Sequence, residues 1–155
     1  MKRIRDQLTP EMRRLERRLV SFTPLWPLVH SEWEAMQYAH FDSMGRGAWL
    51  PQSDATAERR PGGKLLNVTG KLRASTAKGR GHVRIATPQS LTVGTRLPYA
   101  RFHQHGTGRM PARQVIAPSP QFLHRVAGMM LYYVAGGMTS RNPNTGRFRT
   151  NVWGT

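Results

Sequence analysis

Apolar residues recur at helical spacing near both ends of the chain and at strand spacing in its middle. Near the N-terminus, Met12, Leu15 and Leu19 lie three and four residues apart, which places them on one face of a helix. Thr9 supplies a capping hydroxyl, and Pro10 suits the first helical position because the N–H it lacks would have no partner there. We therefore expect a helix that starts at Pro10, with arginines on its other faces.

A second helical repeat extends from about Pro24 to Ser43. Gly45 and Gly47 follow it, and glycine readily adopts the left-handed backbone that ends a helix. We expect its apolar stripe to face the core. The stripe consists of Leu25, Val29, Trp33, Met36 and either His40 or Phe41.

Strand spacing appears in the middle of the chain, at His82–Ala86 and Leu91–Thr95, where polar and apolar residues alternate. Thr87–Ser90 between them has the composition of a turn. The pattern predicts a β-hairpin. Its buried face is expected to carry Val83, Ile85, Leu91 and Val93.

Further elements are shorter or lie later in the chain. Short helices are expected at about Lys71–Ser75 and Pro98–His105, and an additional strand at Val115–Ile116. A last helix is expected from about Gln121 to Ala135. Its inward residues would be Phe122, Val126, Met129, Met130 and Tyr133.

These elements predict an α+β fold in which a small, hairpin-based antiparallel sheet packs against N-terminal and C-terminal helices. Residues 1–135 are expected to form one domain with a long N-terminal helical region, and Arg59–Lys64 a mobile loop. Residues 136–155 are expected to be a C-terminal extension. Its apolar residues among arginines, Phe148, Val152 and Trp153, are consistent either with docking on a neighbour or with a disordered end.

The net charge of the chain adds an expectation about its partners. The 155 residues include 24 Lys and Arg against 8 Asp and Glu, for a formal net charge of +16. Such an excess calls for an anionic partner, which nucleic acid or an acidic protein would supply. Cysteine is absent, which excludes disulfides and thiolate metal sites. The apolar run Val126–Met138 is shorter than the ~20 residues of a membrane-spanning helix.

Candidate chemistry is sparse. All eight acidic residues lie within the first 58 positions, and no spacing pairs two of them for acid–base catalysis. His103 and His105 are the nearest approach to a metal-binding pair, but side chains two residues apart diverge on a helix. Gly79 and Gly81 precede a strand instead of opening a helix, unlike a nucleotide-binding loop. We expect no enzyme, no metal and no cofactor, with a hydrolase that uses His103 or His105 as a remaining alternative.

Four short segments combine turn residues with aromatic and polar anchors: Gly45–Pro51, Val68–Leu72, Tyr99–Gly106 and Met110–Arg113. Their order resembles the phage virion morphogenesis family, also called the tail completion family, of Mu-type tailed phages. The resemblance covers roughly residues 29–134. It is carried by Trp49, Pro51, Ser53, Thr69, Gly70, Leu72, Ser75, Tyr99, Ala100, His103, Gln104, Gly106, Pro111, Ala112 and Arg113. Gln114–Ile116 departs from it, because the family usually has Pro-Phe-Leu there.

The resemblance implies a structural protein of the phage head–tail junction. Such proteins have a short antiparallel sheet packed against helices, and they assemble as rings, often six- or twelvefold, between head connector and tail. Copies of itself, other neck, connector and tail proteins, and packaged double-stranded DNA in the channel would then be the partners. The protein would be assembled in the host cytoplasm and reside in the virion, with no membrane involved.

Arginines in loops and in the extension suit contact with phosphates without base reading. The candidates for DNA or partner contact are Arg59, Arg60, Arg80, Arg109, Arg141, Arg147 and Arg149. An alternative function follows from the charge alone: a basic nucleic-acid-binding protein of the packaging or ribosomal type, acting as a monomer or dimer.

Overall fold

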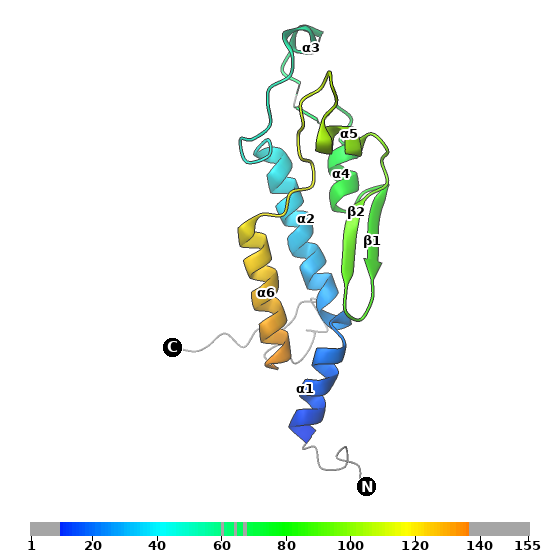
Figure 1. Cartoon of the computed structure of the whole chain (residues 1–155), viewed down its shortest axis with the longest axis vertical. Coiled ribbons are helices and arrows are strands. Elements are labelled where there is room, and N and C mark those ends of the chain that lie inside the picture. The colour runs from blue at the N-terminus through cyan, green and yellow to red at the C-terminus, as the bar shows by residue number, and fades with distance from the viewer. Residues whose placement is uncertain (1–9, 60, 64, 67, 137–155) are drawn as a thin grey trace.

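The protein is described by a computed structural model that covers residues 10–59, 61–63, 65–66 and 68–136. The chain forms an elongated arrangement around one long helix, with the sheet on one side of it and the last helix on the other (Figure 1). The elements are α1 (Pro10–Val20), the 3-10 turn η2 (Thr23–Leu25), α2 (Trp26–Asp42), α3 (Asp54–Arg59), α4 (Lys71–Ala77), β1 (His82–Ala86), β2 (Leu91–Thr95), α5 (Ala100–His105) and α6 (Pro120–Val134). The expected α+β class is confirmed, as is a hairpin packed against helices.

Helix α2 carries the core. Its predicted stripe is buried, and both His40 and Phe41 belong to it. The helix ends where the Ser43 hydroxyl donates to the Ala39 carbonyl at 2.7 Å. Gly45 follows with a φ of +68°, and a Cβ there would lie 2.4 Å from the Trp49 indole. Only glycine permits the chain to turn so closely over that ring.

Three apolar clusters follow one another along α2. Leu25, Trp26, Val29 and Tyr133 form the first, and Trp33, Met36 and Phe122 form the second. The third consists of Phe41, Trp49, Leu72, Ala100 and Val115. Each cluster contains at least one residue of α2. This helix therefore joins α6, α4 and the loops into one body.

Helix α1 forms where the sequence predicts it, but its apolar stripe is not buried. Met12, Leu15 and Leu19 are 52%, 42% and 53% exposed. None of its residues is buried, so helical spacing predicted the element but did not predict that its apolar face is exposed.

The predicted inner face of the hairpin is wrong for β1. Val83 pairs with Gly94 and Ile85 with Thr92, whereas Val93 pairs with Arg84. Because directly opposed residues share a face of the sheet, Val83 and Ile85 lie opposite to the face of Leu91 and Val93. Alternation gives the period of a strand but not its inner face. Here His82 takes an inner position, where its ring contacts α2 and α4.

The strand predicted at Val115–Ile116 is also absent from the described residues. Val115 is 1% exposed, as a core strand would be. However, the Gln104 side chain bonds the main-chain groups that a neighbouring strand would otherwise bond. Its amide donates to the Ile116 carbonyl and its oxygen accepts from the Ile116 N–H, both at 3.0 Å.

Helix α3 was not expected from the sequence.

The register predicts different outcomes for one charge placed on either face of the hairpin. Ile85→Asp, at a side chain that is 56% exposed, should change the free energy of unfolding by no more than about 0.5 kcal/mol. Val93→Asp, beside the Trp33–Phe122 cluster, should cost about 2–4 kcal/mol. Urea denaturation of both variants measures the difference. Equal losses would show that the assigned face is wrong.

Candidate functional site

Three of the four motif segments meet around Arg113, which is buried. Its guanidinium donates from Nε to the Leu50 carbonyl at 2.8 Å and from Nη2 to the Pro51 carbonyl at 2.7 Å. Its main-chain N–H donates to the His103 carbonyl at 2.6 Å. One residue therefore connects the Trp49–Pro51, Tyr99–Gly106 and Met110–Arg113 segments. A charge-assisted, two-pronged bond of this kind fixes geometry as well as adding stability.

The Gln114 carbonyl is the second connection point. It accepts hydrogen bonds from His40 Nε2 at 2.7 Å and from Trp49 Nε1 at 3.1 Å. The Trp49 indole packs edge-on against the rings of His40 and Phe41, with centroids 5.2 Å away in each case. The tryptophan motif thus anchors the 112–117 loop to the end of α2. We call the set Trp49, His103, Gln104, Arg113 and Gln114 the motif junction.

The glycines of the motifs occupy positions where a side chain would not fit or would be strained. Gly106 has a φ of +73°, and a Cβ there would lie 2.7 Å from the main-chain nitrogen of Ala112. Gly70 has a φ of +70° at the start of α4. Leu72, two residues later, is buried with Trp49. These features are consistent with a scaffold that needs these glycines.

The remaining motif residues lie at the edge of the junction. The Tyr99 ring meets the His103 ring edge-on, with 6.2 Å between centroids. The Thr69 hydroxyl accepts from the Lys71 N–H at 3.5 Å. Pro51 and Pro111 line an open cavity of about 1030 Å³, which also has Leu50, Leu65, Leu66, Val68 and Met110 in its wall.

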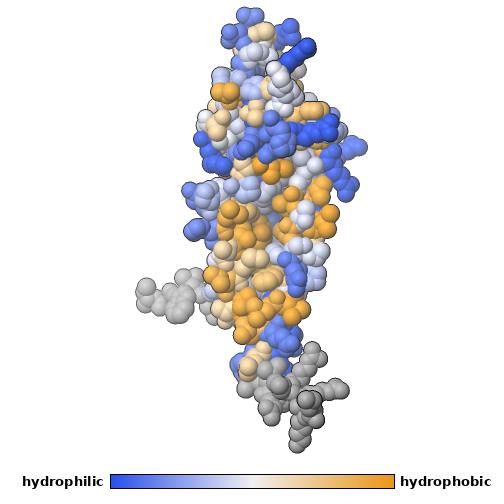
Figure 2. Space-filling view, viewed as in Figure 1, coloured by the Kyte–Doolittle hydropathy of each residue, from blue (hydrophilic) through white to orange (hydrophobic). Residues whose placement is uncertain are grey.

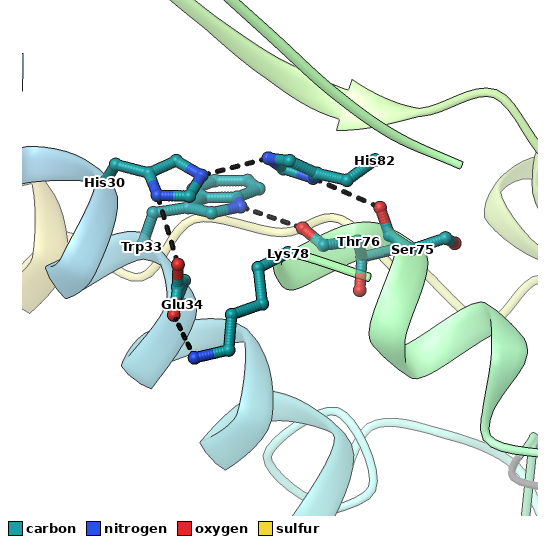
Figure 3. Close-up of polar contacts among 7 residues, drawn as sticks. All are labelled: His30, Trp33, Glu34, Ser75, Thr76, Lys78 and His82. Atoms are coloured by element: carbon teal, nitrogen blue, oxygen red, sulfur yellow. Dashed lines mark hydrogen bonds and ion pairs between the residues drawn. The ribbon is translucent and has the colours of Figure 1, made fainter. Parts of the chain in front are cut away.

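A polar network that the sequence did not indicate joins α2 to α4 and β1 (Figure 3). His30 Nε2 lies 2.9 Å from His82 Nε2, and His30 Nδ1 lies 3.1 Å from Glu34. His82 Nδ1 lies 3.2 Å from the Ser75 carbonyl, and Lys78 pairs with Glu34 at 2.9 Å. No local spacing reveals this cluster, because the two histidines are 52 positions apart.

Counting protons shows what the histidine pair can do. The three contacts from Glu34 to the Ser75 carbonyl need three N–H groups, whereas two neutral imidazoles supply only two. All three bonds therefore form only when the rings share one extra proton. Burial lowers the pKa of His30 and outweighs the opposing Glu34 carboxylate, with Arg84, His82 and Lys78 adding to the lowering. The lowered pKa of His30 favours the neutral form of that ring.

The candidate contact arginines are not brought into the junction. In the described residues, Arg59, Arg80 and Arg109 are exposed, on α3, on the turn before β1 and beside the cavity respectively. Arg60, Arg141, Arg147 and Arg149 lie outside the described residues. The assignment of these arginines to DNA or partner contact stays a prediction.

Other chemistry is sparse in the described part of the chain. No group of three or more His, Cys, Asp or Glu side chains there is placed to hold a metal ion. His103 is half-buried, and burial followed by the Arg113 charge lowers its pKa. No helix among these residues has the length and apolarity that crossing a membrane requires.

Comparison of the chain with protein-family models, with curated proteins and with solved structures gives no match. The resemblance to the tail completion family therefore stands on the motif residues alone.

Arg113→Lys tests whether the junction depends on the guanidinium. Lysine keeps the charge but cannot place two donors on the Leu50 and Pro51 carbonyls. We expect a loss of about 1.5–3 kcal/mol in the free energy of unfolding. Arg109→Lys, at an exposed arginine, is the matched control and should change it by no more than about 0.5 kcal/mol. Indistinguishable losses in the two variants would remove Arg113 from its role.

His40 predicts how stability depends on pH. Burial lowers the pKa of His40, the bond to the Gln114 carbonyl opposes this, and the nearby Arg46 guanidinium lowers it further. Because the unfolded chain then binds a proton more readily than the folded one, acid destabilises the fold. The loss begins as pH falls through the ordinary histidine value of about 6.5.

Denaturation at about pH 7 and about pH 5 measures this loss, given the ordinary histidine pKa of about 6.5. His40→Gln keeps a donor for the Gln114 carbonyl but does not titrate, so its stability should fall less on acidification than that of the natural chain. A natural chain that gains stability in acid, or a variant with an unchanged acid loss, would contradict this assignment.

Proposed function

We propose that this chain is a structural virion protein of the head–tail junction of a tailed phage, assembling as a ring that joins head connector to tail around the DNA. The proposal takes the family from the motif resemblance. One structural observation supports assembly: an amphipathic helix, α1, whose apolar residues are left exposed by the rest of the described chain.

Helix α1 has 11 residues and none of them is buried. Isolated helices shorter than about 12–15 residues are marginal in water, because too few hydrogen bonds repay the cost of the first turn. Although α1 contacts α6, Leu15 and Leu19 stay exposed, so they remain able to pack against a second molecule. On α6, Leu123 and Leu131 are exposed as well, at 55% and 72%. Figure 2 shows hydrophobic surface over the lower half of this face, where α6 lies.

The charge supports a partner of opposite sign. With +16 on each copy, a closed assembly would repel itself unless an anion lay nearby. DNA passing through a ring would supply that charge without any base reading. The exposed Arg59, Arg80 and Arg109 are suited to such contacts. The motif junction would then hold the subunit in one shape, so that repeated contacts between subunits can form.

A second candidate function rests on the same charge. A basic nucleic-acid-binding protein that acts as a monomer or dimer would also carry exposed arginines. The two candidate functions differ in the interaction on which they depend: apolar contacts between copies in the first, and contacts with phosphates in the second. Apolar contacts between copies persist in high salt, whereas binding to phosphates weakens steeply as salt rises.

Light scattering of the chain in high salt, with duplex binding measured in low salt, separates the two functions. In the proposed function the natural chain is an oligomer in high salt. Leu15→Ser with Leu19→Ser should then lower its mass, because it removes the exposed apolar stripe. The control, Arg14→Gln with Arg17→Gln on the same helix, should keep the mass. A high-salt monomer whose duplex binding is weakened only by the arginine pair would favour the second function.

A further inference from the structure

An apolar groove lies between α6 and β2, with α2 as its floor. Its volume is about 280 Å³. Figure 2 shows hydrophobic surface on both sides, over α6 and where Figure 1 places the hairpin. Its apolar lining consists of Trp26, Val29 and Trp33 from α2, Leu91 and Val93 from β2, and Phe122, Val126 and Met130 from α6.

One wall of this groove is an open strand edge. The sheet has only the order β1–β2 in the described chain, and β2 is the strand that lines the groove. Thr87 N donates to the Ser90 carbonyl, and Arg96 N donates to the Gly81 carbonyl, both at 2.8 Å. Bonded and non-bonded pairs alternate along an antiparallel ladder. The N–H and C=O groups of Leu91 and Val93 therefore point away from β1.

No main-chain group among the described residues bonds Leu91 or Val93 on that outer side. An open edge beside an apolar groove suits an extended segment, since the edge supplies hydrogen bonds and the groove accepts alternate side chains.

The described chain leaves α6 at one end of this groove. Near that end the Tyr133 hydroxyl donates to the Ser21 carbonyl at 3.0 Å. The hairpin turn is held at the same corner: the Phe22 N–H donates to the Pro88 carbonyl, and the Phe22 and Tyr133 rings lie 5.9 Å apart. The described chain ends at this corner, at Gly136, whose N–H donates to the Tyr133 carbonyl.

The sequence beyond α6 includes one run with strand spacing. Phe148, Thr150 and Val152 alternate with Arg149 and Asn151, and Phe, Thr and Val favour strands. A tether from 137 to 147 can extend about 35 Å at roughly 3.3 Å per residue, whereas a five-residue strand is only about 17 Å long. A short tether also gives a segment an effective concentration in the millimolar range.

We propose that residues 148–152 of the same chain add a third strand to the sheet, pairing with the open edge of β2 and placing Phe148, Thr150 and Val152 in the groove. The occupant is the chain's own segment and not that of a neighbour, because the tether delivers it to the groove at every protein concentration. This inference is independent of the proposed function, since a strand added within one chain requires neither a ring nor DNA.

Amide hydrogen exchange on the full chain tests the proposal at the Leu91 and Val93 N–H groups. In the natural chain both should exchange slowly, at a rate that does not change on serial dilution. Val152→Asp should speed both by about tenfold or more, because opening the added strand exposes them. Asn151→Asp adds the same charge one residue away, on the opposite face of the added strand, and should leave both rates unchanged.

Amides within α2 report whether each variant remains folded, and they should exchange alike in all three proteins. Fast exchange of Leu91 and Val93 in the natural chain would overturn the proposal, as would equal acceleration by the two aspartate variants. Protection that disappears on dilution would show that the segment comes from a second copy, and this too would overturn the assignment to the same chain.

Discussion

Burial of one face of α2 brings the other elements of the fold together. The three apolar clusters lie in sequence along this helix, and each brings a different part of the chain to it. Polar side chains on the same helix reinforce the attachment: Trp33 Nε1 donates to the Thr76 carbonyl at 2.8 Å, and His40 donates to the Gln114 carbonyl. The result is an elongated body (Figure 1), in which apolar residues such as Leu15 and Leu131 stay exposed.

The motif junction supplies hydrogen-bond partners to main-chain groups in loops. The chain between α5 and α6 is irregular yet partly buried, so its main-chain groups need partners that a sheet would normally provide. Side chains supply them here. Gln104 bonds both groups of Ile116, Trp49 and His40 share the Gln114 carbonyl, and Arg113 bonds the carbonyls of the Trp49–Pro51 segment. The motif residues named here therefore hold loops in place. These are residues on which the family resemblance rests, and their role in this structure is structural.

Sequence reasoning predicted the elements whose signal is local. The α2 stripe, the hairpin and its turn, and the last helix follow from spacing, capping and turn chemistry within a few residues. Sequence reasoning was wrong where the structure depends on a contact between residues far apart in the sequence. The inner face of β1 depends on His82 reaching His30 across 52 positions, and the absence of a strand at Val115 depends on Gln104. The motifs were identified from the sequence. The role of Arg113 in connecting three of them could not be predicted, because a sequence does not show which carbonyls a guanidinium will bond.

These features describe a protein whose loops are held by side-chain hydrogen bonds and whose surface carries exposed apolar residues. Electron microscopy of the chain purified in high salt shows whether this protein acts by joining copies of itself. Closed rings of uniform size that remain when the charge is screened are expected. A field of separate monomers at the same protein and salt concentrations would contradict it.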